Sequence, residues 1–288
     1  MKIGVQIPNF TWPGGAEKLG PTLANIVKTA DQGGFEYIAV MDHFWQLGGQ
    51  PQLDMLEAYT ALGFIAAHTE RAKLLTVVTG ALYRYPGILA KIISTLDVLS
   101  NGRAILGVGA GWNEEESRGL GIPFPPVKER FELLEEALQI CLQMWSESEE
   151  PYQGKHSQLG RTLNVPQPLA KPHPPIMIGG GGEKKTLRFV AKYAQLCNVF
   201  DSPDIERKLT VLREHCQAEG RDYDEIEKTA YYVFNVGENG ERVGETITRL
   251  RELADLGVQT ALGKVEDVHL IKPLEIIANE VIPAVAEF

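Results

Sequence analysis

The sequence is poor in cysteine and has no paired histidines. Its three cysteines, Cys141, Cys197 and Cys216, are widely spaced and form no Cys-x-x-Cys pair. This excludes a disulfide framework and a zinc knuckle, so we expect buried, inert thiols. The six histidines show neither an i, i+2 nor an i, i+4 spacing, so the chain lacks the usual pattern of a histidine metal site. We therefore expect no metal cofactor.

Long apolar runs and an excess of positive charge are also missing. No stretch reaches the ~18 uninterrupted apolar residues of a membrane span, and the N-terminus lacks the apolar region of a signal peptide. The 28 Lys and Arg residues stand against 38 Asp and Glu residues, which gives a formal net charge of −10. An acidic chain is not drawn to nucleic acid or anionic lipid. We expect a cytoplasmic protein whose partner is a small-molecule substrate.

The chain does contain short apolar runs that alternate with amphipathic segments. Hydrophobic residues make up 44% and charged residues 23%, which is typical of a globular protein and excludes a disordered one. Eight strand-like runs are each followed by a helical pattern, and such alternation predicts a parallel sheet. The runs lie at residues 3–8, 37–41, 74–78, 104–108, 176–178, 196–200, 229–236 and 258–262.

Eight such units within this length favour an α/β fold, a closed (β/α)8 TIM barrel, over an open doubly wound sheet. The open sheet also needs Gly-x-Gly-x-x-Gly after its first strand, where this chain has Pro8-Asn9-Phe10. We expect one domain over residues 1–288. An irregular insertion at about residues 147–175 follows the fourth unit, with a small hairpin around Gly154-Lys155-His156.

The polar and glycine residues that end the strands are the candidates for chemistry, because active sites of this barrel lie there. His43 suits proton transfer. Neighbouring residues on a strand face opposite sides, so Asp42 and His43 are not both expected to point inward. The turn at residues 107–113 admits a flat ring beside Trp112 and Asn113, or else is a plain turn with a core tryptophan.

A second glycine turn carries a signal for phosphate. Residues 179–182 are four glycines between a strand and a helix expected from Glu183, with Lys184 and Lys185 following. Glycines let the backbone approach an anion, and a helix start offers unpaired N–H groups. A plain tight turn is the alternative. No Gly-x-Ser-x-Gly elbow is present, which argues against a serine hydrolase. Asp42 and Asp201 both follow strands, so a glycosidase that uses these two carboxylates remains an alternative.

Together these strand ends resemble the bacterial luciferase-like family, in particular its members that use the deazaflavin coenzyme F420. The resemblance rests on residues 41–44, 83–86, 89–91, 96–103, 107–113 and 178–182. It implies a TIM-like barrel, commonly a homodimer, that binds the deazaflavin or FMN at its open end. It also implies a non-prolyl cis peptide in the third strand, at Val77-Val78.

Site residues follow from the same resemblance. It implies ring contacts at Asp42, Val77, Val78, Gly109, Gly111, Trp112 and Asn113, and phosphate contacts at Gly180, Gly181 and Gly182 with Glu183 and Lys184 adjoining. His43 matches a position implicated in catalysis in a sugar-phosphate dehydrogenase of the family. There a Glu acts after the fourth strand, at about the place of Trp112 here, which argues against that reaction.

We therefore expect an oxidoreductase that transfers a hydride between coenzyme F420 and a small organic substrate, with His43 as proton donor or acceptor. Phe10, Trp12, Trp45 and Tyr83 either shape the substrate pocket or pack in the core. An FMN-dependent monooxygenase that acts on paired donors with O2, and a non-catalytic flavin-binding barrel, are the alternatives.

Overall fold

A computed structural model describes all 288 residues, and its centre is a parallel barrel. The barrel sheet has the strand order β3-β2-β1-β11-β10-β9-β8-β5-β4. An isolated parallel bridge between Leu74 of β3 and Ala104, just before β5, closes the barrel. The strands are β1 (Lys2–Ile7), β2 (Tyr37–Val40), β3 (Lys73–Thr76), β4 (Thr79–Gly80), β5 (Leu106–Gly109), β8 (Ile176–Gly179), β9 (Leu196–Phe200), β10 (Glu227–Tyr231) and β11 (Thr260–Lys264). The predicted (β/α)8 barrel is confirmed.

The third barrel strand is broken into β3 and β4. The Val77-Val78 peptide between them is cis, at the predicted bond. The Thr76 hydroxyl lies 2.9 Å from both the Thr79 hydroxyl and the Gly107 carbonyl oxygen, so these contacts join the two pieces to β5. Gly107 is required here because a Cβ at that position would overlap the Thr76 carbonyl oxygen.

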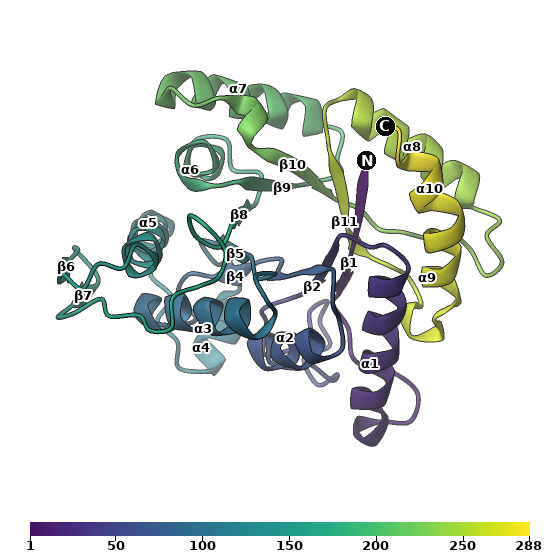
Figure 1. The fold of residues 1–288 in the computed structure, drawn as a ribbon, viewed down its shortest axis with the longest axis horizontal. Helices are drawn as coiled ribbons and strands as arrows, with labels where there is room; N and C mark the ends of the chain where they lie inside the picture. Colours follow the sequence, from purple (N-terminus) through teal and green to yellow (C-terminus); the bar gives the residue numbers. More distant parts are fainter.

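Helices surround the barrel, and the two chain ends lie close together (Figure 1). The Met1 ammonium group donates to the carbonyl oxygens of Val285 and Phe288, at 2.5 and 2.9 Å. The helices are α1 (Ala16–Gln32), α2 (Ala58–Ala67), α3 (Pro86–Leu99), α4 (Glu114–Gly119), α5 (Val127–Trp145), α6 (Thr186–Tyr193), α7 (Ile205–Glu219), α8 (Val243–Asp255), α9 (Lys272–Ile276) and α10 (Ile282–Val285), with a π turn at Ile277–Val281.

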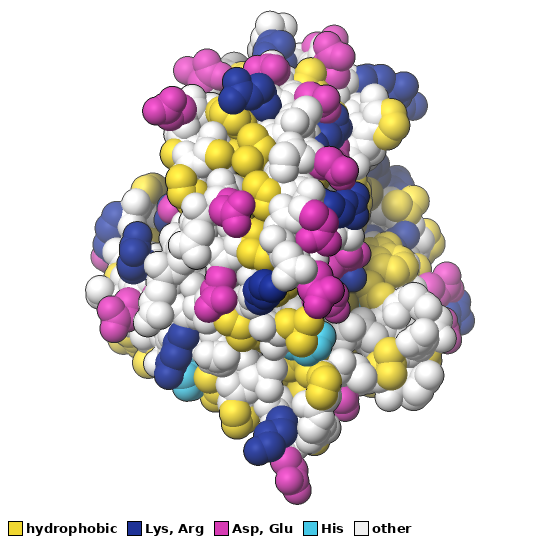
Figure 2. Space-filling model, turned by 90° about the vertical axis from the view of Figure 1, so that its right-hand side faces the viewer, with side chains coloured by type: hydrophobic (Ala, Val, Ile, Leu, Met, Phe, Trp, Pro, Cys, Tyr) yellow, Lys and Arg dark blue, Asp and Glu magenta, His cyan; other side chains and the backbone are white.

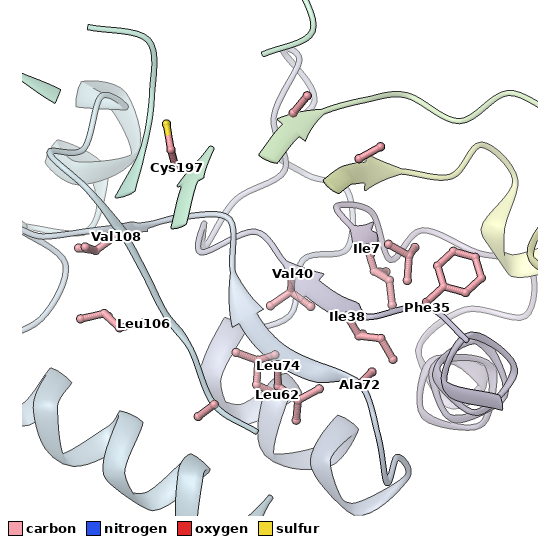
Figure 3. Close-up of a cluster of buried hydrophobic side chains, with 14 of the residues drawn as sticks. Ile7, Phe35, Ile38, Val40, Leu62, Ala72, Leu74, Leu106, Val108 and Cys197 are labelled. Atoms are coloured by element: carbon pink, nitrogen blue, oxygen red, sulfur yellow. The ribbon is translucent and has the colours of Figure 1, made fainter. Parts of the chain in front are cut away.

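Strand alternation divides the core into two layers. On β2, Ile38 and Val40 pack with Leu62 and Leu74 in the large cluster between sheet and helices (Figure 3). Their neighbours on the strands point into the barrel and form a second, smaller cluster: Tyr37, Ala39, Leu75, Ile105, Met177, Leu196 and Leu262. This inner cluster fills the barrel interior below the carboxyl ends of the strands, as layered side chains do in this fold.

The insertion follows α5 and contains the predicted hairpin, formed by β6 (Tyr152–Gln153) and β7 (Gln158–Leu159). The buried Glu136 carboxylate accepts hydrogen bonds from the backbone N–H groups of Lys155, His156 and Ser157, which fixes the hairpin turn on α5. One predicted boundary is wrong: the helix expected from Glu183 begins at Thr186, because residues 183–185 form a turn.

The surface mixes both signs of charge. On the face drawn in Figure 2, acidic and basic side chains are interspersed with small hydrophobic groups. None of the helices combines the length and apolar character that crossing a membrane requires.

Candidate active site

A cavity of about 350 Å³ opens at the carboxyl ends of the barrel strands. This volume lies within the usual range for a small-molecule site, roughly 300–1,000 Å³. The lining residues come from strand ends and the loops that follow them: Gln6, Met41, His43, Leu47, Val77, Val78, Thr79, Gly80, Tyr83, Gly111, Trp112, Gly179, Gly180, Asn198, Phe200 and Tyr231. The structure thus brings together His43, both valines of the cis peptide, Trp112, Tyr83 and Gly180.

His43 is held by a carboxylate that the sequence analysis did not select. The His43 Nδ1 atom lies 2.8 Å from Oε2 of Glu116, whose side chain is fully buried. Tyr83 donates its hydroxyl hydrogen to the same oxygen at 2.8 Å. The N–H groups of Phe44 and Trp45 donate to Oε1 at 2.7 and 2.9 Å. Three donors and the His43 ring nitrogen therefore converge on Glu116.

The charge state of Glu116 follows from these contacts. Burial alone would raise the pKa of the Glu116 carboxyl, but the hydrogen bonds from His43, Trp45 and Tyr83 hold it below its ordinary value. Glu116 is therefore a carboxylate at neutral pH. Burial and the bond to Glu116 raise the pKa of Tyr83 above its ordinary value, so its hydroxyl stays protonated.

Asp42 does not line the cavity although its neighbour His43 does, in keeping with the expectation that the two do not both point inward. Its side chain is fully buried, and Arg84 binds it with two hydrogen bonds, of 2.5 Å to Oδ2 and 3.0 Å to Oδ1. Arg84 also donates to Glu57 at 2.5 Å and lies over the Tyr59 ring. Asp42 thus anchors the loop that carries His43 and is not among the lining residues.

The cavity floor is polar at two points. The Gln6 amide nitrogen donates to the carbonyl oxygen of Val77 at 2.8 Å, and its Oε1 atom is buried without a partner. The Asn198 amide nitrogen donates to the Thr229 hydroxyl at 2.7 Å. Inward-facing side chains of β1 and β9 therefore carry the polar groups above the inner cluster.

The ring loop, which we define as residues 109–113, forms one wall. Trp112 is 65% exposed, and its ring centroid lies 5.5 Å from that of His43. Gly111 adopts φ +77°, and Arg130 donates to its carbonyl oxygen at 2.5 Å. Gly109 lies within β5 and Asn113 caps α4, accepting a hydrogen bond from the Glu116 N–H at 3.2 Å. Neither Gly109 nor Asn113 lines the cavity.

The glycine turn, residues 179–182, borders the cavity through Gly179 and Gly180. The backbone N–H groups of residues 181–185 make no hydrogen bond within the chain, so this turn presents a run of free donors. Lys208 of α7 stands over Gly181, with its Nζ atom 3.9 Å from the position of a Cβ there. Such donors beside a cation fit an anion.

Charges around the glycine turn differ from the sequence expectation. Glu183 pairs with Arg207 at 2.6 Å and Lys208 at 2.9 Å, and these hydrogen bonds lower the pKa of the Glu183 carboxyl. The Lys185 ammonium lies over the Phe131 ring, and Lys184 is exposed. Arg207 and Lys208, two cations beside the turn and Glu183, thus come from α7, a helix that the sequence motif does not include.

Of the four aromatic residues proposed for the substrate pocket, one lines the cavity and three pack elsewhere. Tyr83 lines the cavity. Phe10 and Trp12 are buried in the main core, with ring centroids 5.6 Å apart. Trp45 packs against Gly119 of α4, where a Cβ would overlap the indole ring.

We predict that Gly181→Asp weakens binding of a phosphate-bearing cofactor at least about tenfold, because the new carboxylate repels the anion and pairs with Lys208. Gly181 has no positive φ, so the variant is expected to fold. Gly181→Asn is the control, since it adds the same bulk without charge and should bind more tightly than Gly181→Asp. The dissociation constant is measured by fluorescence titration. Unchanged affinity in folded Gly181→Asp would remove the anion assignment.

Comparison with known proteins gives three findings. The model of a family described as luciferase-like monooxygenase matches residues 1–267. An F420-dependent glucose-6-phosphate dehydrogenase of Kineococcus radiotolerans is 32% identical over 228 residues, which cover 74% of this chain and 64% of that protein. An uncharacterized protein of Mycobacterium tuberculosis is 34% identical over 170 residues, 58% of each chain. The chain thus spans less than two thirds of the length of these relatives.

The fold is also found in solved structures. A coenzyme F420-dependent tetrahydromethanopterin reductase from Methanopyrus kandleri superposes with a TM-score of 0.80 at 20% identity, covering 98% of both chains.

Proposed function

The chain belongs to the family of luciferase-like monooxygenases, and from this premise we propose that it is an oxidoreductase. In this proposal a hydride passes between the deazaflavin coenzyme F420 and a small organic substrate. One observation carries the proposal: a histidine backed by a buried carboxylate lines the same cavity as Gly179 and Gly180, which lead into a run of free N–H donors at residues 181–185. The F420-dependent dehydrogenase relative supports the choice of cofactor.

The residues fit a flat cofactor that carries a phosphate. The glycine turn would hold the phosphate through its free N–H groups. Lys208, which pairs with Glu183 and Asp204, lies beside Gly181 and would add positive charge there. The cis-bonded Val77 and Val78 and the ring loop would hold the ring system between apolar surfaces. When bound, the deazaflavin supplies hydride chemistry, and the protein supplies orientation and a site shielded from water.

His43 would exchange a proton with the substrate. Its Nδ1 atom is occupied by Glu116, and its other ring nitrogen has no partner within the chain. Since the side chain lines the cavity, that second nitrogen is available to a bound substrate. Tyr83, bonded to the same carboxylate, would place its phenol oxygen beside the reacting group.

An FMN-dependent monooxygenase is the second candidate, and the description of the matching family favours it. FMN also combines a phosphate with a three-ring system, so the same residues suit it. The proposal further predicts turnover, which separates it from a barrel that only stores a flavin.

Titration of the purified protein with each cofactor tests the proposal. We expect saturable binding of coenzyme F420, followed by its oxidation or reduction in the presence of a small alcohol or carbonyl compound from a substrate panel. No saturable F420 binding together with micromolar FMN binding would favour the monooxygenase. Tight F420 binding without turnover on any substrate would favour the storage role.

A further inference from the structure

We propose that Glu116 is a positioning residue that fixes the tautomer of His43, so that the histidine nitrogen facing the cavity is a hydrogen-bond acceptor. The protonation pattern itself is independent of the proposed function. Its consequence for the substrate rests on that function. Glu116 lies on α4, outside every motif that the sequence analysis used.

The argument begins with what Glu116 can do in its surroundings. A carboxylate only accepts hydrogen bonds. Both of its oxygens are engaged, with Oε1 bound to two backbone N–H groups and Oε2 bound to Tyr83 and His43. The 2.8 Å contact to His43 therefore requires a hydrogen on Nδ1. In a neutral imidazole the remaining nitrogen, Nε2, then carries a lone pair.

Tyr83 is constrained in the same way. Its hydroxyl hydrogen points to Glu116 Oε2 at 2.8 Å, so its phenol oxygen is left as an acceptor. Two side chains that line the cavity therefore both present acceptors. This pair suits a substrate that brings an O–H donor, which points to the alcohol form of a substrate rather than the carbonyl form.

The ring loop ties this network to the cofactor wall. Asn113 accepts a hydrogen bond from the Glu116 N–H at 3.2 Å, and Trp112, one residue earlier, stands against the His43 ring. The other charged groups near His43 are already paired with each other, because Asp42 and Glu57 both bind Arg84. Glu116 is thus the group that sets the His43 hydrogen position.

The test is NMR of the ligand-free protein labelled with 15N-histidine, recorded over a pH series that extends to about pH 9. The His43 signals are assigned by their loss in His43→Asn. For the natural protein we expect a protonated Nδ1 and a bare Nε2. A protonated Nε2 with a bare Nδ1 would overturn the proposal. This readout needs no cofactor, so it stands apart from failure of the proposed function.

Glu116→Gln gives the sharper result. The amide oxygen is expected to stay on the Phe44 and Trp45 N–H groups, which need an acceptor, so the NH2 group faces His43. Donation from that NH2 to Nδ1 reverses the tautomer, and turnover should fall by about 10²-fold or more, as for a histidine held in the wrong tautomer.

The matched control is Glu115→Gln, because Glu115 is the exposed neighbour and its side chain makes no hydrogen bond. It should leave both the tautomer and turnover unchanged. A folded Glu116→Gln protein with the tautomer of the natural protein would overturn the proposal. If Glu116→Gln does not fold, the spectrum of the natural protein decides alone.

Discussion

Replacement of His43 by alanine is expected to lower turnover by about 10²–10⁴-fold, the usual contribution of a positioned general acid or base. The His43 side chain lines the cavity and is fixed by Glu116 at 2.8 Å. The N–H donors that we propose for the cofactor phosphate lie in the glycine turn after β8 and the residues that follow it, a separate part of the site. Cofactor affinity should therefore change by less than about threefold. Steady-state kinetics and fluorescence titration measure the two quantities.

His68→Ala serves as the control. His68 follows α2 at the opposite end of the barrel, and its Nδ1 atom contacts only the Phe64 carbonyl oxygen. It should leave turnover unchanged. Turnover by His43→Ala close to that of the natural protein would remove the role in proton transfer, whereas an equal loss of cofactor binding would make His43 a cofactor ligand instead.

Replacement of Arg84 by methionine is expected to destabilise the protein by about 3–5 kcal/mol, because it leaves a buried carboxylate without its partner. Asp42 has a fully buried side chain and receives both Arg84 hydrogen bonds. Methionine keeps most of the volume of arginine, so the loss reflects charge more than packing. Urea unfolding gives the free energy.

Two further variants separate the causes of this loss. Arg161→Met removes an exposed arginine that pairs with Glu149, and a surface pair of this kind should matter by less than about 1 kcal/mol. The double variant Asp42→Asn with Arg84→Met should recover part of the lost stability, since no unpaired charge is then buried. A loss below about 1 kcal/mol in Arg84→Met would show that Asp42 is protonated or reaches water.

The positions of the cis peptide and of the strand ends could be predicted because each depends on residues that are neighbours in the sequence. The cis peptide at Val77-Val78 agrees with the structure, and so does the expectation that Asp42 and His43 do not both enter the cavity, since only His43 lines it. The alternation of side chains along a strand and the order of strands and helices can be read from the sequence. The periodicity of apolar residues predicts them, and the resemblance to a known family predicts the cis peptide.

Contacts between distant segments could not be predicted in this way. Glu116 stands in a run of three acidic residues, and nothing in the sequence distinguishes it from the other two. Only folding shows that Glu116 alone is buried and faces His43, while its two neighbours are exposed. Lys208 likewise reaches the glycine turn from α7, 27 positions after Gly181.

The sequence by itself determined the barrel, because alternating apolar runs and helices admit few other ways of burying their apolar faces. It also determined which strand ends hold small, polar or aromatic residues. The tertiary structure alone decided which charges are buried, which are paired and which atom carries each proton. Those properties depend on distances of a few ångströms between residues far apart along the chain, and Coulomb energy and desolvation change steeply over such distances.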